Sequence, residues 1–318
     1  MHIVVLDGHT LNPGDNPWTE LEPLGSLTVH DRTPPDQIVA RAKEAAIVVT
    51  NKTPISSATL AELPGLKCIA VLATGYNVVD VAAAALRGIP VCNVPTYGTQ
   101  SVAQHTFALI LELCHQVGRH DRSARDGDWT RSPDWCYWKS PLVELDGKVL
   151  GLIGSGRIGR AVGRIGQAFG MEVWTTPGRS SASNPPEGWR VKEREEIFRQ
   201  ADVVSLHCPQ TQDNLGFVNG ALLAQMKPSA FLINTARGSL ITEFDLAQAL
   251  AAGKLAGAAL DVVSAEPIRP DNPLLNAKNC ILTPHIAWSS LPARERLMKV
   301  TAANIRGFLQ GEVVNRVN

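Results

Sequence analysis

The sequence predicts an α/β protein built from two doubly wound parallel sheets. Short runs of β-branched residues alternate with helical stretches of about ten or more residues, an order typical of helices that cover both faces of a parallel sheet. One of these strands leads directly into a glycine-rich turn and a helix. The length of 318 residues is about twice that of a common domain, so we expect two separate cores.

The predicted strands are short apolar runs bounded by polar residues. Because the runs are almost continuously apolar, we expect both faces of each strand to be buried, as in a parallel sheet. In chain order they cover residues 3–6, 47–50, 68–72, 91–94, 149–153, 173–176, 203–207, 231–234 and 258–262.

Helical periodicity and capping residues mark the helices between these strands. Apolar residues recur at helical spacing from residue 101 to residue 117, which predicts one long amphipathic helix. Thr242 is placed to cap a second helix, and Gly253 is placed to end it. The segments 42–54 and 194–209 each carry a charged helix into a buried strand and a polar turn, which suggests two similar halves.

Composition and charge limit the classes of partner. Hydrophobic residues make up 44% and charged residues 19%, which is typical of a folded globular protein. Thirty basic residues balance thirty acidic ones, so we expect neither nucleic acid nor a membrane as a partner. The first residues, MHIVVLDGH, are typical of a strand rather than a secretory signal, and no apolar run approaches a membrane span. These features predict a cytoplasmic protein.

The cysteines are scattered along the chain without a C-x-x-C pair, so we expect neither a disulfide framework nor a metal site. They are Cys68, Cys92, Cys114, Cys136, Cys208 and Cys280. Reduced packing residues are the expected role. A catalytic cysteine is the alternative, but none of the six lies in a recognisable nucleophile motif.

A glycine-rich turn after the strand at 149–153 is the strongest local motif. Gly154 permits a tight turn, Gly156 lets the backbone approach a pyrophosphate, and Gly159 permits close packing of the helix on the strand. Free N–H groups at the start of the helix attract the phosphates. The whole context favours dinucleotide binding over a glycine turn that serves packing alone. The expected cofactor contacts in the turn are Gly154, Ser155, Gly156, Arg157, Ile158 and Gly159.

The end of the next strand bears on the choice between NAD and NADP. NAD sites usually carry an acidic residue there, about twenty residues after the turn, to bind the ribose 2′-hydroxyl. This sequence instead continues from Trp174 as Thr-Thr-Pro-Gly to Arg179 and Ser180, and Arg179 can accept a 2′-phosphate. The sequence therefore favours NADP. The alternative is that Arg179 is a solvated loop residue and either cofactor binds.

Several further motifs follow one another in a characteristic order. They are Ala73-Thr-Gly75-Tyr-Asn-Val-Val-Asp80, Ser101-Val-Ala-Gln-His-Thr106, His207-Cys-Pro209, Asn234-Thr-Ala-Arg237-Gly238, Ala259-Leu-Asp261-Val262, Glu266-Pro267 and Thr283-Pro-His285. With the glycine turn, they make the chain similar to the D-isomer-specific 2-hydroxyacid dehydrogenases over essentially its whole length. Within that family, Ser132-Pro-Asp-Trp-Cys-Tyr-Trp138 and Pro284-His-Ile-Ala-Trp288 resemble the glycerate dehydrogenase, or hydroxypyruvate reductase, subgroup.

The resemblance implies a domain layout that composition does not. It places a Rossmann-type dinucleotide-binding domain at residues 99–286, inserted in a flavodoxin-like substrate domain formed by residues 1–98 and 287–318. Without it, two consecutive domains would be expected. The resemblance also implies a homodimer joined through the cofactor domain near Trp135 and Trp138. Trp138 either reaches the neighbouring active site or packs within its own subunit.

The resemblance implies a catalytic set of His285, Glu266 and Arg237. His285 would protonate the carbonyl oxygen of a 2-keto acid as hydride arrives, a role that suits an imidazole. Glu266 would contact the other ring nitrogen and keep the protonated acid available at neutral pH. Arg237 would grip the substrate carboxylate and polarise the carbonyl. Taken singly, each residue has a structural alternative as a surface or turn residue.

The remaining contacts also follow from the resemblance. Backbone N–H groups around Thr74, Gly75 and Tyr76 would bind the substrate carboxylate. The expected cofactor contacts outside the turn are Thr106 and Asp261 near the nicotinamide, Thr235 through its backbone, Arg179, and His207, Cys208 and Pro209 along the adenosine. For Asp261, the capping of a strand end is the alternative.

Together these features predict an NAD(P)-dependent D-2-hydroxyacid dehydrogenase with a small-molecule substrate. Hydroxypyruvate, glyoxylate and other small keto acids are all compatible with the sequence. The alternative is a nicotinamide-sensing scaffold of the same fold that binds partners instead of turning over substrate.

Overall fold

The computed structural model describes residues 1–178 and 185–318, and the chain divides into two compact units. Unit 1 comprises Met1–Gly98 and Trp288–Asn318, and unit 2 comprises Thr99–Ala287. Each unit contains its own parallel sheet with helices on both faces. These two α/β sheets confirm the predicted fold class.

Unit 1 is built on a five-stranded parallel sheet with the strand order β2-β1-β3-β4-β5. This order is that of the flavodoxin-like sheets. The strands are β1 His2–Val5, β2 Ser26–Val29, β3 Ile47–Thr50, β4 Cys68–Val71 and β5 Val91–Cys92. The helices are α1 Ile38–Ala42, α2 Ser57–Ala61, α3 Val81–Leu86 and α10 Leu291–Leu309.

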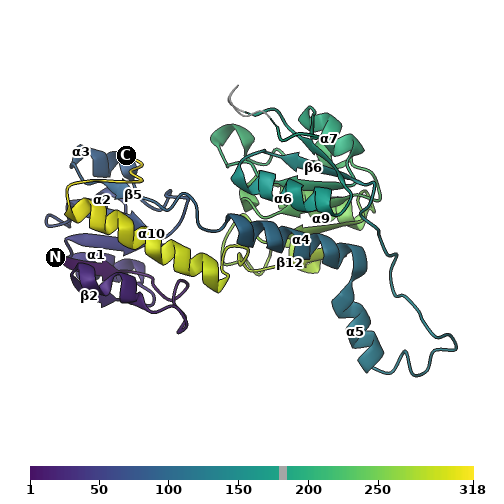
Figure 1. The fold of residues 1–318 in the computed structure, drawn as a ribbon, viewed down its shortest axis with the longest axis horizontal. Coiled ribbons are helices and arrows are strands. Elements are labelled where there is room, and N and C mark those ends of the chain that lie inside the picture. The colour runs from purple at the N-terminus through teal and green to yellow at the C-terminus, as the bar shows by residue number, and fades with distance from the viewer. Residues whose placement is uncertain (179–184) are drawn as a thin grey trace. The chain divides into compact units, whose positions relative to one another are not determined.

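The residues of each strand alternate between the two cores of unit 1. In β1, Val4 packs with α1, α2 and α3, whereas Ile3 and Val5 pack with the buried face of α10. Figure 1 shows α10, in yellow, lying across this sheet. Beyond α10 the chain returns to the edge of the sheet, where Val317 N donates to Val91 O at 2.9 Å. Residues 315–318 thus cover the outer side of β5.

Unit 2 is built on a seven-stranded parallel sheet with the order β12-β11-β10-β9-β6-β7-β8. The reversal of strand order between β6 and β9 is that of a dinucleotide-binding doubly wound sheet. The strands are β6 Val149–Ile153, β7 Glu172–Thr175, β8 Arg190–Val191, β9 Val203–Leu206, β10 Phe231–Asn234, β11 Gly257–Leu260 and β12 Cys280–Leu282.

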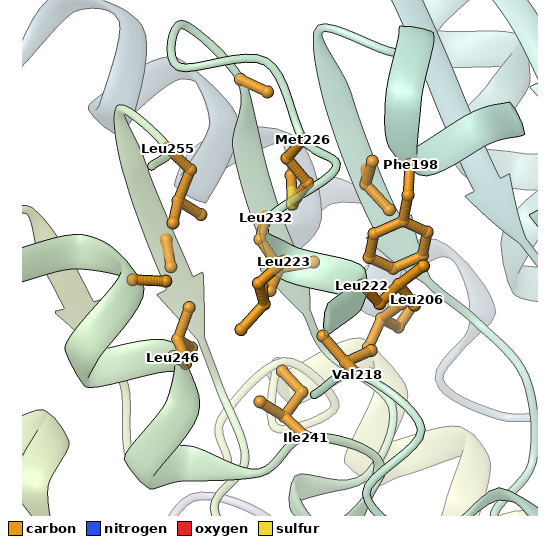
Figure 2. Packing of buried hydrophobic residues seen from close by; sticks show 14 of the residues in the cluster. Phe198, Leu206, Val218, Leu222, Leu223, Met226, Leu232, Ile241, Leu246 and Leu255 are labelled. Carbon is orange, nitrogen blue, oxygen red and sulfur yellow. The ribbon is translucent and has the colours of Figure 1, made fainter. Parts of the chain in front are cut away.

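The helices of unit 2 cover both faces of its sheet. One core joins the strands to α7 (Arg194–Gln200), α8 (Gly220–Leu223) and α9 (Glu243–Ala251), and Figure 2 shows Phe198, Leu223 and Leu246 of these helices in the same cluster as Leu232 of β10. The second core joins the strands to α4 and α6. The helices are α4 Thr99–His115, α5 Val117–Arg125, α6 Arg157–Ala168, α7 Arg194–Gln200, α8 Gly220–Leu223 and α9 Glu243–Ala251.

Single turns of 3₁₀ helix complete the described secondary structure. They are Trp18–Glu20, Glu22–Leu24, Pro35–Gln37, Gln212–Asn214, Gly238–Leu240 and Pro273–Asn276.

Two local predictions differ from the structure. The long helix expected to reach residue 117 ends at His115, because Gln116 adopts a left-handed backbone with φ +46° before α5 begins. Thr242 stands at the N-terminal end of α9, but its side chain does not cap the helix and its hydroxyl instead faces Gly216 O at 3.4 Å. Three strands were also not predicted, namely β2, β8 and β12.

None of the helices in the described part of the chain combines the length and the apolarity that a membrane span requires.

Candidate active site

Four functional candidates lie at the carboxyl ends of adjacent strands in unit 2. His207, Arg237 and Asp261 follow β9, β10 and β11, and His285 follows β12. The glycine turn follows β6, which neighbours β9. Because all these strands are parallel, the candidates lie along one edge of the sheet, where ligands bind in doubly wound folds.

The glycine turn has the shape that a pyrophosphate requires. Gly154 has φ +111°, and a Cβ there would lie 2.8 Å from the backbone carbon of His207. A Cβ at Gly159 would lie 2.1 Å from Gly154 O, so helix α6 packs directly on the turn. At Gly156, the residue before α6, a Cβ would meet no atom of the described residues within 4 Å. The turn therefore leaves open space beside the amino end of a twelve-residue helix, and these residues fit the phosphates of a dinucleotide.

His207 lies against this turn in an uncharged setting. Its Nε2 lies 2.9 Å from Ser205 Oγ, and His207 N donates to Ile153 O at 2.9 Å. Burial lowers the pKa of His207 to about 4, because removal from water disfavours the charged form of the ring. The ring is therefore neutral at neutral pH and does not add a cation beside the phosphates.

A pocket of about 350 Å³ opens beside the end of β7. Its lining includes Thr176 and Pro177 from this strand end, with Cys208 after β9 and Arg194 at the start of α7. Thr176 Oγ accepts a hydrogen bond of 3.1 Å from Gly154 N, which ties the strand end to the glycine turn. No acidic residue stands at the end of β7 itself, in agreement with the sequence. The predicted phosphate contact Arg179, with Ser180, lies outside the described residues.

His285 and Glu266 are in direct contact. His285 Nδ1 lies 2.6 Å from Glu266 Oε2, and the two side chains are 28% and 32% exposed. Within the described residues, the other ring nitrogen, Nε2, makes no hydrogen bond. The carboxylate thus fixes the Nδ1–H tautomer and leaves Nε2 available for proton transfer.

Arg237 is presented by a tight turn after β10. Asn234 holds the turn, because its Nδ2 donates to Arg237 O at 2.9 Å and its Oδ1 accepts from Ala236 N at 3.0 Å. The guanidinium is exposed and donates to Ala236 O at 2.7 Å. A Cβ at Gly238 would lie 1.9 Å from the backbone carbon of Val263, so the Arg237 turn packs against the segment that leads to Glu266.

The loop that carries Glu266 is fixed from helix α9. Glu243, the first residue of that helix, accepts hydrogen bonds of 2.7 Å from both Ser264 N and Ser264 Oγ. It also accepts a bond of 2.9 Å from Asn272 Nδ2 at the far end of the loop. The sequence did not indicate this role of Glu243, because a glutamate at the start of a helix does not reveal which distant groups donate to it.

Asp261 is buried and its carboxylate is occupied by the segment around His285. Its oxygens accept from Thr283 Oγ at 2.6 Å, Ile286 N at 2.9 Å and Ala287 N at 2.8 Å. Burial raises the pKa of this carboxyl, but these bonds together with His105 outweigh burial and hold the pKa below its usual range. These bonds are those of the strand-end cap that was the alternative for this residue. A contact with the nicotinamide stays a prediction.

Two threonines link helix α4 to the end of β10. Thr106 Oγ lies 3.0 Å from Thr235 Oγ and also donates to Val102 O at 2.8 Å. Since the Thr106 hydroxyl hydrogen points to Val102, Thr235 is the donor between the two threonines. The pair is buried, which places both predicted cofactor residues in one hydrogen-bonded unit.

In unit 1, the predicted carboxylate-binding segment follows β4. Thr74 Oγ donates to Val94 O at 2.8 Å, and Thr74 O accepts from Asn93 Nδ2 at 2.7 Å. Within the described residues, the backbone N–H groups of Thr74, Gly75 and Tyr76 donate to no other group. Three consecutive unpaired donors are suited to an anionic ligand.

The described residues contain neither an activated cysteine nor a cluster of metal ligands. All six cysteines are free thiols. Burial raises the pKa of Cys280 to about 12 and that of Cys114 to about 11, so neither is an activated nucleophile. No group of three or more His, Cys, Asp or Glu side chains suited to a metal ion is found in this part of the chain.

Comparison with known proteins decides the family. Residues 107–287 match the model of the D-isomer specific 2-hydroxyacid dehydrogenase, NAD binding domain. The chain belongs to this family. It is therefore an NAD(P)-dependent dehydrogenase that interconverts 2-keto acids and 2-hydroxy acids. This finding confirms the enzyme prediction over the scaffold alternative.

Two relatives of the dehydrogenase have names that state an activity. It is 50% identical to a hydroxypyruvate reductase of Blautia hydrogenotrophica over 100% of both chains. It is 39% identical to a glycerate dehydrogenase of Methylorubrum extorquens, over 89% of this chain and 88% of the relative. These relatives confirm the predicted resemblance to the glycerate dehydrogenase subgroup.

A solved structure extends the comparison to a liganded enzyme. The NADPH-dependent glyoxylate/hydroxypyruvate reductase of Sinorhizobium meliloti, in complex with NADP and malonate, matches the dehydrogenase with a TM-score of 0.84 and 29% identity. The match covers 99% of this chain and 96% of the solved one.

Proposed function

We propose that this dehydrogenase reduces hydroxypyruvate or glyoxylate to the D-2-hydroxy acid, with NADPH as the preferred hydride donor. The contact between His285 and Glu266 carries the proposal, because it leaves one imidazole nitrogen free to deliver a proton. The names of the relatives from Blautia and Methylorubrum support the substrate class. The nicotinamide supplies hydride to the carbonyl carbon when it is bound.

The chain's own residues would perform three tasks. His285 donates a proton from Nε2 to the carbonyl oxygen, while Glu266 at Nδ1 holds the ring and stabilises the protonated acid. Arg237 binds the substrate carboxylate and polarises the carbonyl. The N–H groups of residues 74–76, which donate to no group within the described residues, would bind a substrate carboxylate. The substrate role of residues 1–98 with 287–318, and the cofactor role of residues 99–286, belong to this proposal.

The cofactor would lie along the carboxyl edge of the sheet in unit 2. The turn from Gly154 to Gly159 would hold the pyrophosphate, and the pocket beside Thr176 and Cys208 would take the adenosine with His207 and Pro209. Thr106, Thr235 and Asp261 would lie near the nicotinamide, which agrees with the buried threonine pair.

A kinetic comparison tests the enzyme as proposed. Oxidation of NADPH and NADH is followed side by side with hydroxypyruvate, glyoxylate and pyruvate. We expect the highest kcat/KM with hydroxypyruvate or glyoxylate and NADPH. His285→Ala should lower kcat by about 10²–10⁴-fold, the range for loss of a general acid, and leave the affinity for NADPH unchanged. His115→Ala, an exposed histidine on α4, is the matched control and should retain full activity. Near-normal turnover by His285→Ala would refute its role as acid.

NADP preference has its own test at Arg179. The missing acid at the end of β7 and the NADPH-dependent relative from Sinorhizobium support NADP. Arg179→Ala should raise the KM for NADPH by about tenfold or more, because a charge-assisted bond to phosphate is lost, and should change the KM for NADH by much less. Equal changes in both values would remove the phosphate contact from the proposal.

We also propose that the enzyme is a cytoplasmic homodimer joined through unit 2. Helix α5 and the segment 126–144 project from the body of this unit, as Figure 1 shows. The segment exposes Trp135 by 87% and Trp138 by 67%. Large apolar side chains that lie close in sequence and are this exposed are typical of a surface that a second copy of the chain covers.

A further inference from the structure

His105 is a histidine of α4 that the proposed function does not use. Its Nε2 lies 3.1 Å from Thr283 Oγ and 3.5 Å from Asp261 Oδ1. We propose that His105 is a positioning residue for His285 and acts through Thr283 and Asp261. This inference rests on the proposed function of His285 as the acid.

His285 stands in a backbone conformation that needs support. Its φ is +55°, in the left-handed region that side-chain-bearing residues rarely adopt. His285 N donates both to Asp261 O at 2.8 Å and to Thr283 O at 2.9 Å. The direction of the imidazole therefore depends on how firmly the surrounding segment, residues 283–287, is tied to Asp261. We call this segment the His285 turn.

The carboxylate of Asp261 ties both ends of the His285 turn. Thr283 Oγ and Ile286 N donate to its Oδ1, and Ala287 N donates to its Oδ2. Asp261 follows β11 and Thr283 follows β12, and the two strands are hydrogen-bonded neighbours. A buried carboxylate with these donors fixes the backbone on each side of His285 without touching its ring.

The hydrogen-bond directions give His105 a defined place in this arrangement. The hydroxyl hydrogen of Thr283 is directed to the ionised Asp261, so Thr283 Oγ can only accept from His105. His105 therefore carries its proton on Nε2 and donates to Thr283. This bond fixes the rotamer in which Thr283 donates to Asp261. The Nε2–H group of His105 also faces the Asp261 carboxylate and helps to stabilise its charge.

Helix α4 holds the same turn at a second point. Ser101 Oγ donates to Ala287 O at 2.7 Å, one helical turn before His105. The helix is anchored in the core of unit 2 through Phe107 and Ile110. The His285 turn is thus fastened to a rigid element as well as to the sheet, which is what the precise placement of a proton donor requires.

Variants of His105 test the proposal. His105→Phe keeps an aromatic ring and removes the donor, and we expect kcat to fall by about tenfold while the dissociation constant for NADPH changes by less than about twofold. His105→Gln places an N–H donor near the position of Nε2 and should restore most of kcat. His115→Phe, on the same helix but exposed, is the matched control and should not change kcat.

A second pair of variants tests the connection itself. Thr283→Val keeps the shape and loses the hydroxyl, so it should lower kcat as His105→Phe does, whereas Thr283→Ser should stay close to the unaltered enzyme. The double variant with His105→Phe should lose no more than Thr283→Val alone, because both act through one chain of bonds. These measurements remain informative if His105→Phe does not fold.

The outcomes separate this inference from the proposed function. If His285→Ala abolishes turnover but His105→Phe and Thr283→Val keep normal kcat, the positioning role is wrong and the acid role stands. If His285→Ala keeps turnover, the acid role is wrong. An equal loss of kcat and NADPH affinity in His105→Phe, without rescue by His105→Gln, would also overturn the inference, because a general structural defect produces that pattern.

Discussion

Two histidines of unit 2 differ in what surrounds the ring. His285 has a carboxylate oxygen 2.6 Å from Nδ1, and 28% of its side chain is exposed. Within the described residues the ring of His207 has a serine hydroxyl as its hydrogen-bond partner, and burial lowers its pKa to about 4. One environment is suited to a residue that gains and loses a proton, and the other keeps a ring neutral beside the glycine turn.

The low pKa of His207 predicts a loss of stability in acid. As the pH falls through 6.5 the unfolded chain protonates this residue, whereas the folded protein does not until about pH 4. The free energy of unfolding should therefore fall between these values, by about 2 kcal/mol when the partial exposure of the residue is allowed for.

Urea unfolding at pH 7.5 and pH 4.5 measures this effect. His207→Gln keeps a partner for Ser205 but does not titrate, so its stability should fall less between the two pH values than that of the unaltered protein. His115→Gln, at an exposed site, should follow the unaltered protein. If all three proteins lose the same free energy of unfolding between the two pH values, His207 is not the group responsible.

The residues of the site differ in how far the sequence could indicate them. The glycine turn follows from steric requirements that are visible in the letters themselves. The set of His285, Glu266 and Arg237 came from family resemblance, because residues 237, 266 and 285 are distant in sequence and only the fold brings 266 and 285 together. Nothing in the sequence announces the left-handed backbone of His285 or the bond from His105.

At the level of elements, the glycines of the turn meet two different requirements, namely close packing and space for a ligand. Gly159 is needed for packing, since a Cβ there would lie 2.1 Å from Gly154 O. Gly156 has extended backbone with φ −70° and open space around it, so only a ligand requires its small size. We therefore propose that one glycine of the motif serves packing and the other serves ligand binding.

Alanine variants of these two glycines should behave differently. Gly156→Ala should leave the midpoint of thermal unfolding nearly unchanged but weaken NADPH binding by about tenfold or more, because the methyl group occupies space beside the phosphates. Gly159→Ala should lower thermal stability by several degrees, because the backbone of the turn must move. Calorimetry and fluorescence titration measure both properties, and similar stability losses in the two variants would contradict the distinction.

The strands also show where prediction from sequence fails. The central strands β3, β6 and β10, which are buried except for the first residue of β6, were predicted with their observed limits, because a continuous apolar run marks burial on both faces. The missed strands lie at sheet edges, where side chains are half-buried or exposed and the apolar signal is lost. Edge strands depend on pairing with a neighbour, and pairing is a property of the fold.

At the level of the whole molecule, each unit has hydrophobic cores of its own. The proposed dimer contact involves residues of unit 2 alone. The tryptophans of the segment 126–144 belong to unit 2, and they are not part of either core of that unit. Association through this segment would bury apolar surface that the cores of unit 2 leave exposed.

Sedimentation analysis tests this assembly. We expect the unaltered protein to sediment with twice the mass of the chain, and the variant Trp135→Ser/Trp138→Ser to dissociate at micromolar concentration, since aromatic anchors dominate such contacts. Phe244→Ser, which replaces a 61% exposed aromatic residue on α9, is the control and should stay dimeric. A monomeric unaltered protein would refute the proposal.

The segment 315–318 has a consequence for the solution behaviour of unit 1. It pairs with backbone groups of β5 and of the residue after it, since Val317 N donates to Val91 O and Asn93 N donates to Asn315 O. Asn318 adds side-chain bonds to Val91 N and Ile89 O. Without these residues the sheet would present an unpaired apolar edge to other molecules, which is a template for aggregation. Residues 315–318 thus prevent aggregation through the edge of this sheet. An affinity tag is better placed at the N-terminus, where it does not disturb them.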